Sequence, residues 1–225
     1  MSFSPESRVF LQQLSENNER AWFEAHKADY ERTLRQPALD FIEAMAGPLA
    51  GFAPNFRADA RRMRGSLMRL HRDTRFSNDK SPYKTNLGIQ FRHALGKDVH
   101  APGFYVHLSP MECFLGVGCW SPEPEVLKRI RDAVADRPDR WFRASQDEAF
   151  RRRFELAGDS LSRPPRGYTA DHPAIDDLKR KGFIAVSEIT WEQAGAMEFV
   201  ARAAEAFAAS TPFMGFLCGS LGLSL

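Results

Sequence analysis

A polar segment between Arg61 and Lys84 carries the residue types that are best suited to binding an anion. It holds eight Lys or Arg residues but only two Asp. Such an excess of cations needs a solvated surface, an anionic partner or internal carboxylates to balance it. Turn-forming residues between Ser77 and Pro82 indicate a structured loop rather than a helix. The sequence therefore predicts either an anion site or a solvated loop that its own ion pairs hold in place.

In the first of these interpretations, cations hold the ligand and an aromatic ring forms a wall beside it. Guanidinium groups bind carboxylate or phosphate through paired hydrogen bonds, which suits the arginines of this loop. Asp73 lies between two arginines and Asp79 precedes a lysine, so both carboxylates are also candidates for internal partners of these cations. The predicted ligand-binding residues of the loop are Arg72, Asp73, Arg75, Lys80, Tyr83 and Lys84.

Strands with alternating apolar residues are expected after this loop. Leu87, Ile89 and Phe91 alternate with polar residues or glycine, and two more alternating segments follow from residue 104 and from residue 113. A hairpin of these two segments must place both apolar sets on one face, because a one-residue slip would expose one set. Pairing Leu108 with Cys113 meets this condition.

On the other face, this register places glycines beside two polar side chains. Tyr105 lies opposite Gly116, and Gly103 lies opposite Gly118. Glycine in a strand often marks the close approach of a ligand or of another backbone. The face is therefore either the floor of a pocket, with the basic loop as its wall, or a groove that a helix fills. In a pocket, His107 is the candidate proton donor or acceptor and Tyr105 would position the ligand.

A second stiff basic segment lies later in the chain, around the two consecutive prolines at 164 and 165. It supplies Arg163, Arg166 and Tyr168 as further candidate ligand-binding residues, and Trp120 is another candidate. We expect this segment to meet the first loop in space, where Arg166 would add to the clamp on the anion.

The order of elements predicts a single α+β domain over residues 1–225. Residues 1–52 are predicted to be helical, residues 60–120 to form the sheet core, and residues 121–225 to form helices and one strand. We expect a central, mostly antiparallel sheet of about five strands, packed by N-terminal, middle and C-terminal helices. The five strands are predicted at 66–71, 86–92, 104–108, 113–117 and 183–189, and helical segments are expected as far as Gly158.

Composition argues against several classes of protein, although the excess of basic residues is local. The net charge of +2 gives no global field that would attract nucleic acid. Three cysteines without a CxxC motif argue against a disulfide framework and a zinc knuckle. Because the sequence also lacks a signal peptide pattern and a long apolar run, we expect a cytoplasmic protein with no membrane partner, and we predict no metal and no cofactor.

Several longer motifs resemble a known family. The chain contains, in order, RDTRFSNDKSPYKTN, PGFYVHLSP, GVGCWSPEPE and RPPRGYTADHPAIDDLKRKGF. From Phe3 to Phe216 it closely resembles the bacterial domain-of-unknown-function family 2461. The resemblance implies a single α+β domain and no established activity. It places the polar signature of the family on Arg72, Asp73, Arg75, Phe76, Lys80, Pro82, Tyr83, Lys84, Tyr105, His107, Trp120, Arg163, Pro164, Arg166 and Tyr168.

Three functions remain open at this point. The first is a pocket for a small anionic ligand, which in an enzyme would indicate a hydrolase or transferase without a tightly bound cofactor. The second is a nucleic-acid binder, in which Tyr83, Phe76 and Trp120 stack on bases. The third is a structural or interaction module whose arginine, aspartate and tyrosine residues brace one another.

Overall fold

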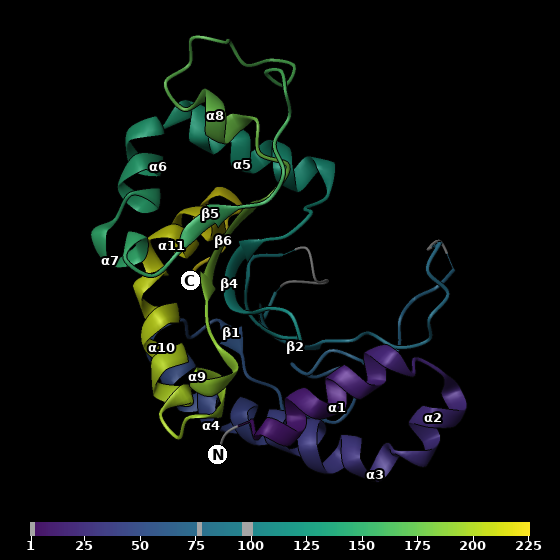
Figure 1. The fold of residues 1–225 in the computed structure, drawn as a ribbon. Helices are drawn as coiled ribbons and strands as arrows, with labels where there is room; N and C mark the ends of the chain where they lie inside the picture. Colours follow the sequence, from purple (N-terminus) through teal and green to yellow (C-terminus); the bar gives the residue numbers. More distant parts are fainter. Residues whose placement is uncertain (1–2, 76–77, 96–100) are drawn as a thin grey trace.

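The first and last elements along the chain are helices, and most of the strands come from the middle of the sequence (Figure 1). The structure, a computed structural model, describes residues 3–75, 78–95 and 101–225. The helices are α1 (Pro5–Glu16), α2 (Arg20–Ala25), α3 (Lys27–Tyr30), the π-helix η1 (Glu31–Arg35), α4 (Gln36–Phe52), α5 (Pro124–Asp136), α6 (Pro138–Ser145), α7 (Glu148–Arg151), α8 (Ile175–Leu178), α9 (Trp191–Gly195), α10 (Phe199–Ala209) and α11 (Thr211–Ser220). Within the described ranges, no helix has the length and apolar character that a membrane span requires.

The described residues form one antiparallel sheet of six strands, in the order β1-β2-β3-β4-β6-β5. The strands are β1 (Phe56–Arg57), β2 (Leu87–His93), β3 (Gly103–Leu108), β4 (Cys113–Cys119), β5 (Glu155–Ala157) and β6 (Phe183–Glu188). This confirms the predicted α+β fold and its antiparallel sheet. The hairpin register is also confirmed, since Leu108 pairs with Cys113 and Tyr105 with Gly116.

The strands that differ from the prediction lie at the edges of the sheet. Residues 66–71 are not one of the six strands, but they run beside β2, where the Met68 amide donates to the Gly88 carbonyl at 2.9 Å. The helical prediction as far as Gly158 is wrong, because α7 ends at Arg151 and β5 follows it. Both missed strands, β1 and β5, have only two or three residues, too few to show an alternating pattern.

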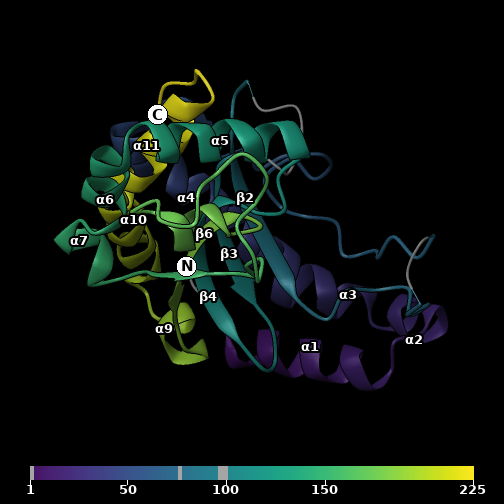
Figure 2. The same ribbon diagram turned by 90° about the horizontal axis from the view of Figure 1, so that it is seen from above.

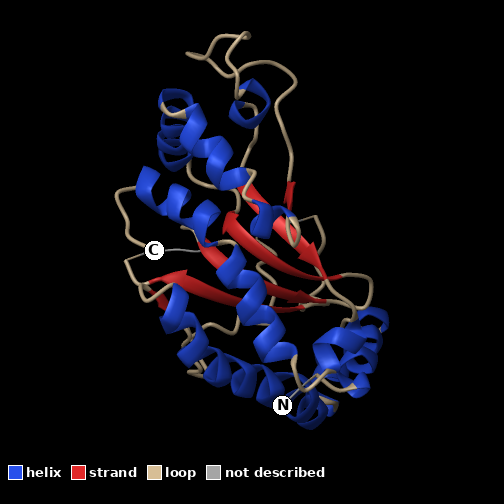
Figure 3. Cartoon of the chain, turned by 90° about the vertical axis from the view of Figure 1, so that its left-hand side faces the viewer, coloured by secondary structure: helices blue, strands red, loops and turns tan. Residues whose placement is uncertain are grey.

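The apolar face of the sheet is covered by helices. Figure 2 shows α10, α11 and α4 on one side of the strands, and Figure 3 shows helices crossing that side of the sheet. Aromatic rings join the layers: the ring centroids of Phe104 and Phe207 are 5.1 Å apart, and those of Phe41 and Phe91 are 6.4 Å apart. The many phenylalanines of the sequence therefore lie largely in this core, which holds the strands rigid beneath the opposite face.

The N-terminal helices pack beside the loop that precedes β2. Helices α3, η1 and α4 follow one another directly, and the wider π turn of η1 changes the backbone hydrogen-bond pattern at this point. The buried hydroxyl of Ser7 in α1 donates to the Thr33 carbonyl of η1 at 2.7 Å. This bond ties α1 to η1.

Candidate functional site

A cavity of about 410 Å³ lies on the face of the sheet that the helices leave open. Its floor includes Gly103, Tyr105 and His107 of β3, and Gly116 and Gly118 of β4. No residue of a described helix lines it, so the groove is not filled by helix packing. The glycine-bearing face therefore has open space, which is the first of the two alternatives that the register left open.

Two of the floor glycines leave space in different ways. A Cβ atom on Gly116 would lie 3.6 Å from the Cβ of Tyr105, an ordinary contact, so this glycine keeps space open without being required by the backbone. Gly118 has a φ of +116°, and a Cβ atom there would lie 2.1 Å from the Phe183 carbonyl oxygen. Only glycine fits at position 118, because both the dihedral angle and the neighbouring strand β6 exclude a side chain.

Tyr105 and His107 form a polar pair on this floor. The Tyr105 hydroxyl lies 3.3 Å from Nδ1 of His107, and the Asn86 side chain also hydrogen-bonds to the hydroxyl. The imidazole stacks on Phe114 with ring centroids 4.6 Å apart, and its Nε2 lies 3.6 Å from Oε1 of Glu112. Three neighbours thus fix the orientation of the imidazole.

Burial sets the protonation of this pair. It raises the pKa of Tyr105 to about 12, so the phenol keeps its proton at neutral pH. It also lowers the pKa of His107, an effect that the carboxylate of Glu112 opposes. At neutral pH the phenol can donate or accept a hydrogen bond but does not act as a base, and the neutral imidazole carries one N–H donor and one acceptor nitrogen.

Lys84 supplies positive charge at the wall of the cavity. It is half-buried, and its backbone amide donates to the Leu70 carbonyl at 2.8 Å. Burial lowers the pKa of its ammonium group, and the nearby charges of Arg69 and Arg72 lower it further. In the part of the chain that the structure describes, no carboxylate pairs with Lys84, and no other Lys or Arg lines this cavity.

The other cations of the basic loop are held by residues of the loop itself. Arg72 forms an ion pair with Asp79, and Arg75 forms one with Asp73 at 2.7 Å. Hydrogen bonds from Arg75 lower the pKa of Asp73 to about 2. Lys80 donates to the carbonyl of residue 74 at 2.9 Å. These contacts agree with the interpretation in which the loop is held in place by its own ion pairs. None of these cations lines the cavity.

Tyr83 lies in the core rather than at the cavity. Its side chain is 2% exposed and stacks on Phe23 of α2 with ring centroids 4.3 Å apart. The Asn18 side chain also bonds to both the amide and the carbonyl of Tyr83, at 3.0 Å each. These contacts anchor the loop to the N-terminal helices. Phe76, which the family signature includes, lies outside the described residues.

The second basic segment does not meet the first. Tyr168 donates to Asp132 of α5 at 2.9 Å, and burial raises its pKa to about 12. Arg163 and Arg166 are exposed beside it. Figure 1 and Figure 2 place this segment and the loop around Arg72 in different parts of the molecule. The prediction that the two segments come together, with Arg166 in one clamp, is therefore wrong.

Four of the predicted site residues line the cavity, namely Tyr105, His107, Lys84 and Trp120. Trp120 stands apart from the other three. Its side chain is 64% exposed, so the indole stands at the mouth.

Sequence reasoning missed other lining residues. Gln90 of β2 pairs with Tyr105, and extending the hairpin register to β2 would have found it. Ile184 and Val186 come from β6, whose pairing with β4 has no local signal in the sequence. Other missed lining residues include Met68, Asn86, Glu112 and Phe114. Within the described residues, no group of His, Cys, Asp or Glu side chains has the proximity that a metal ion requires.

The comparisons with known proteins identify the family. A family model described as "Conserved hypothetical protein (DUF2461)" matches residues 6–216. The chain belongs to this family. A search of the curated proteins found no match. The resemblance read from the motifs is thereby confirmed, and membership in family 2461 brings the whole cavity floor and the Arg72–Lys84 loop within the matched region.

Proposed function

We propose that the cavity binds a small molecule with an apolar body and one anionic group, a phosphate or a carboxylate. The observation that carries this proposal is the environment of Lys84. A half-buried ammonium group beside two arginines is unfavourable unless an anion accompanies it, and the described residues supply no carboxylate to Lys84. A bound anion would supply the missing charge.

The remaining walls favour a ligand whose body is apolar. Phe114, Val186 and Ile184 offer apolar surface on the floor, and Trp120 offers an aromatic face at the mouth. Concave, mostly apolar pockets with a few polar groups are typical of small-molecule sites, and their polar groups orient the ligand. Tyr105 and His107 are the polar groups of the floor, where the imidazole could exchange a proton with the ligand.

A thermal-shift screen tests the proposal. The probes are inorganic phosphate, sulfate, sugar phosphates, nucleotides, dicarboxylates and aromatic carboxylates, each titrated against the wild type. A ligand at about 100 times its dissociation constant stabilises the folded state by about 2.7 kcal/mol, which a melting curve detects readily. We expect a saturable rise in melting temperature with one of these classes.

Three variants locate the binding. Lys84→Gln removes the charge, and Gly116→Val places a side chain on the floor at a position where a Cβ atom meets only ordinary contacts. Both are expected to weaken binding at least about tenfold, or 1.4 kcal/mol. Lys80→Gln is the matched control, because it removes the same charge from the same loop outside the cavity. A response that is equal in all three variants, or no response to any probe, would contradict the proposal.

A further inference from the structure

A row of arginines lies along the β1 edge of the sheet. Arg57 of β1 and Arg92 of β2 are directly opposite each other in the antiparallel register. Like charges in this position repel and destabilise a strand pair, and a bound anion would relieve this repulsion. In the described residues neither guanidinium group pairs with a carboxylate, and Arg92 reaches only the Gly65 carbonyl at 3.5 Å.

The turn that follows β1 adds two more exposed arginines, Arg62 and Arg64. Neither side chain has an ion pair among the described residues. Arg64 has a φ of +62°, a strained conformation for a residue with a side chain. The neighbouring Gly65 is packed so closely that a Cβ atom there would lie 2.4 Å from the Asp59 carbonyl oxygen. The fold thus holds a strained turn that keeps both arginines in solvent.

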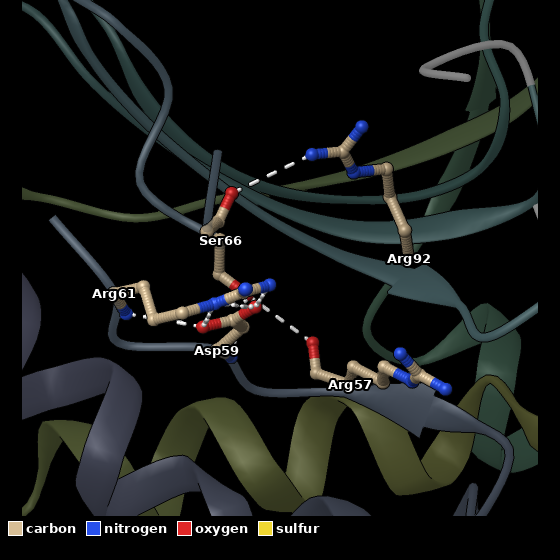
Figure 4. Close-up of polar contacts among 6 residues, drawn as sticks. Arg57, Asp59, Arg61, Ser66 and Arg92 are labelled. Carbon is tan, nitrogen blue, oxygen red and sulfur yellow. Dashed lines mark hydrogen bonds and ion pairs between the residues drawn. The ribbon is translucent and has the colours of Figure 1, made fainter. Parts of the chain in front are cut away.

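Hydrogen bonds fix the base of this turn (Figure 4). The Ser66 hydroxyl accepts from the Asp59 amide at 3.0 Å and donates to the Arg57 carbonyl at 3.2 Å. Arg61 neutralises the Asp59 carboxylate, with Nε 2.9 Å from both carboxylate oxygens. The acidic residue of the turn is therefore already paired, which leaves the net positive charge of the surrounding arginines in place. An open hollow of about 570 Å³ adjoins them, and its lining includes Arg57 and the exposed Glu43.

We infer that the arginine row, defined as Arg57, Arg62, Arg64 and Arg92, binds the phosphate backbone of a nucleic acid. Residues 66–72 run extended beside β2 from this turn and carry Arg69 and Arg72, which are already paired with Asp73 and Asp79. An extended segment advances about 3.3 Å per residue, so these charges are spread along an edge. A linear polyanion can contact such a row at several points, and planar guanidinium groups match phosphate oxygens.

Fluorescence anisotropy with a labelled oligonucleotide of about 20 nucleotides, single-stranded and duplex, tests the inference at about 50 to 200 mM salt. The test variant is Arg57→Gln/Arg62→Gln/Arg64→Gln. The matched control is Arg151→Gln/Arg152→Gln/Arg153→Gln, which removes the same charge from exposed arginines around α7. We expect the test variant to bind at least tenfold more weakly at low salt and its log–log salt slope to fall by about 2 to 3. The control should bind within about twofold of the wild type.

Other outcomes would overturn the inference. Equal losses in both triple variants would mean that binding follows net charge and not the row. Preferential binding of the wild type to poly-glutamate or to vesicles with anionic lipid would assign the row to another partner. If the triple variant does not fold, Arg62→Gln/Arg64→Gln leaves both strands intact and is expected to show an intermediate loss. Gly116→Val should bind the oligonucleotide like the wild type, so this test is independent of the cavity.

Discussion

The hydroxyl of Tyr105 lies 3.3 Å from Nδ1 of His107, and the two residues are two positions apart in β3, on the same face. Because burial keeps the phenol protonated, Tyr105 can donate to Nδ1, and the single proton of the neutral imidazole then lies on Nε2. Nε2 faces Glu112 at 3.6 Å. The pair therefore offers a ligand an oriented neutral imidazole.

The buried imidazole makes folding stability depend on pH. The pKa of His107 is lowered below its ordinary value of 6.5, so the unfolded chain binds this proton more readily than the folded protein does. The contribution of His107 to stability is therefore full above pH 6.5 and falls as the pH drops toward the lowered pKa. Chemical denaturation at a series of pH values should show a smaller loss of stability in His107→Gln than in the wild type across this range. An NMR titration midpoint above 6.5 would contradict the argument.

Gly88 and Tyr105 should interact strongly in a double-mutant cycle. A Cβ atom at Gly88 would lie 2.7 Å from the Tyr105 hydroxyl and 3.2 Å from the sulfur of Met68. Gly88→Ala alone therefore forces the phenol to move. Tyr105→Phe alone removes a hydrogen bond and costs about 1–3 kcal/mol, because polar partners remain buried. Tyr105→Phe also removes the hydroxyl oxygen that a Cβ atom at position 88 would clash with. The double variant should therefore lose less stability than the sum of the losses of the two single variants, by about 0.5–3 kcal/mol. Urea unfolding measures these free energies. Strict additivity would show that the two positions do not compete for space.

The sequence predicted which residues share the floor of the cavity. The alternation of apolar residues and the need to bury them on one face allow only one register for the hairpin. Leu108 can pair only with Cys113 if both strands are to bury their apolar residues, and Tyr105, His107 and Gly116 then share a face. The pairing left open whether a ligand or a helix would occupy that face, and no residue of a described helix lines the cavity there. The walls were harder to predict from the sequence. Ile184 lines the cavity because β6 pairs with β4, and these two strands are far apart in the chain.

Charged loops gave the weaker predictions, and for a physical reason. A carboxylate such as Asp73 or Asp79 can either support a ligand-binding arginine or neutralise it, and the sequence is the same in both cases. The structure shows neutralisation at Arg72 and Arg75, whereas Lys84 stands apart from these pairs. Tyr83 was predicted to bind the ligand because it belongs to the loop by sequence. Its ring packs in the core instead, while its backbone stays in the loop.

Two glycines of the cavity floor should respond differently to alanine. Gly118→Ala places a side chain at a φ of +116° and against the Phe183 carbonyl. The dihedral strain alone costs about 1–3 kcal/mol, and the clash adds to it. Gly116→Ala meets only ordinary contacts and should change the free energy of unfolding by less than about 1 kcal/mol. Urea unfolding of the two variants measures both values. A Gly116→Ala variant as unstable as Gly118→Ala would show that the floor has no free space above Gly116.

Tyr83 should matter for stability and not for ligand binding. Its ring is buried against Phe23 and beside His71, so Tyr83→Ala is expected to cost about 3–5 kcal/mol. Tyr83→Phe keeps the ring, and it should retain nearly all of the stability of the wild type. Urea unfolding of the two variants tests this difference.

Ligand titration of Tyr83→Phe then separates packing from recognition. Tyr83 does not line the cavity and its side chain is buried in the core, so the variant should bind the cavity ligand like the wild type. Lys84→Gln is the comparison, because its side chain does line the cavity and its substitution should weaken binding. If Tyr83→Phe instead lost affinity while melting normally, the phenol would contact the ligand, and the anion would lie on the loop side of Lys84 rather than over the glycine floor.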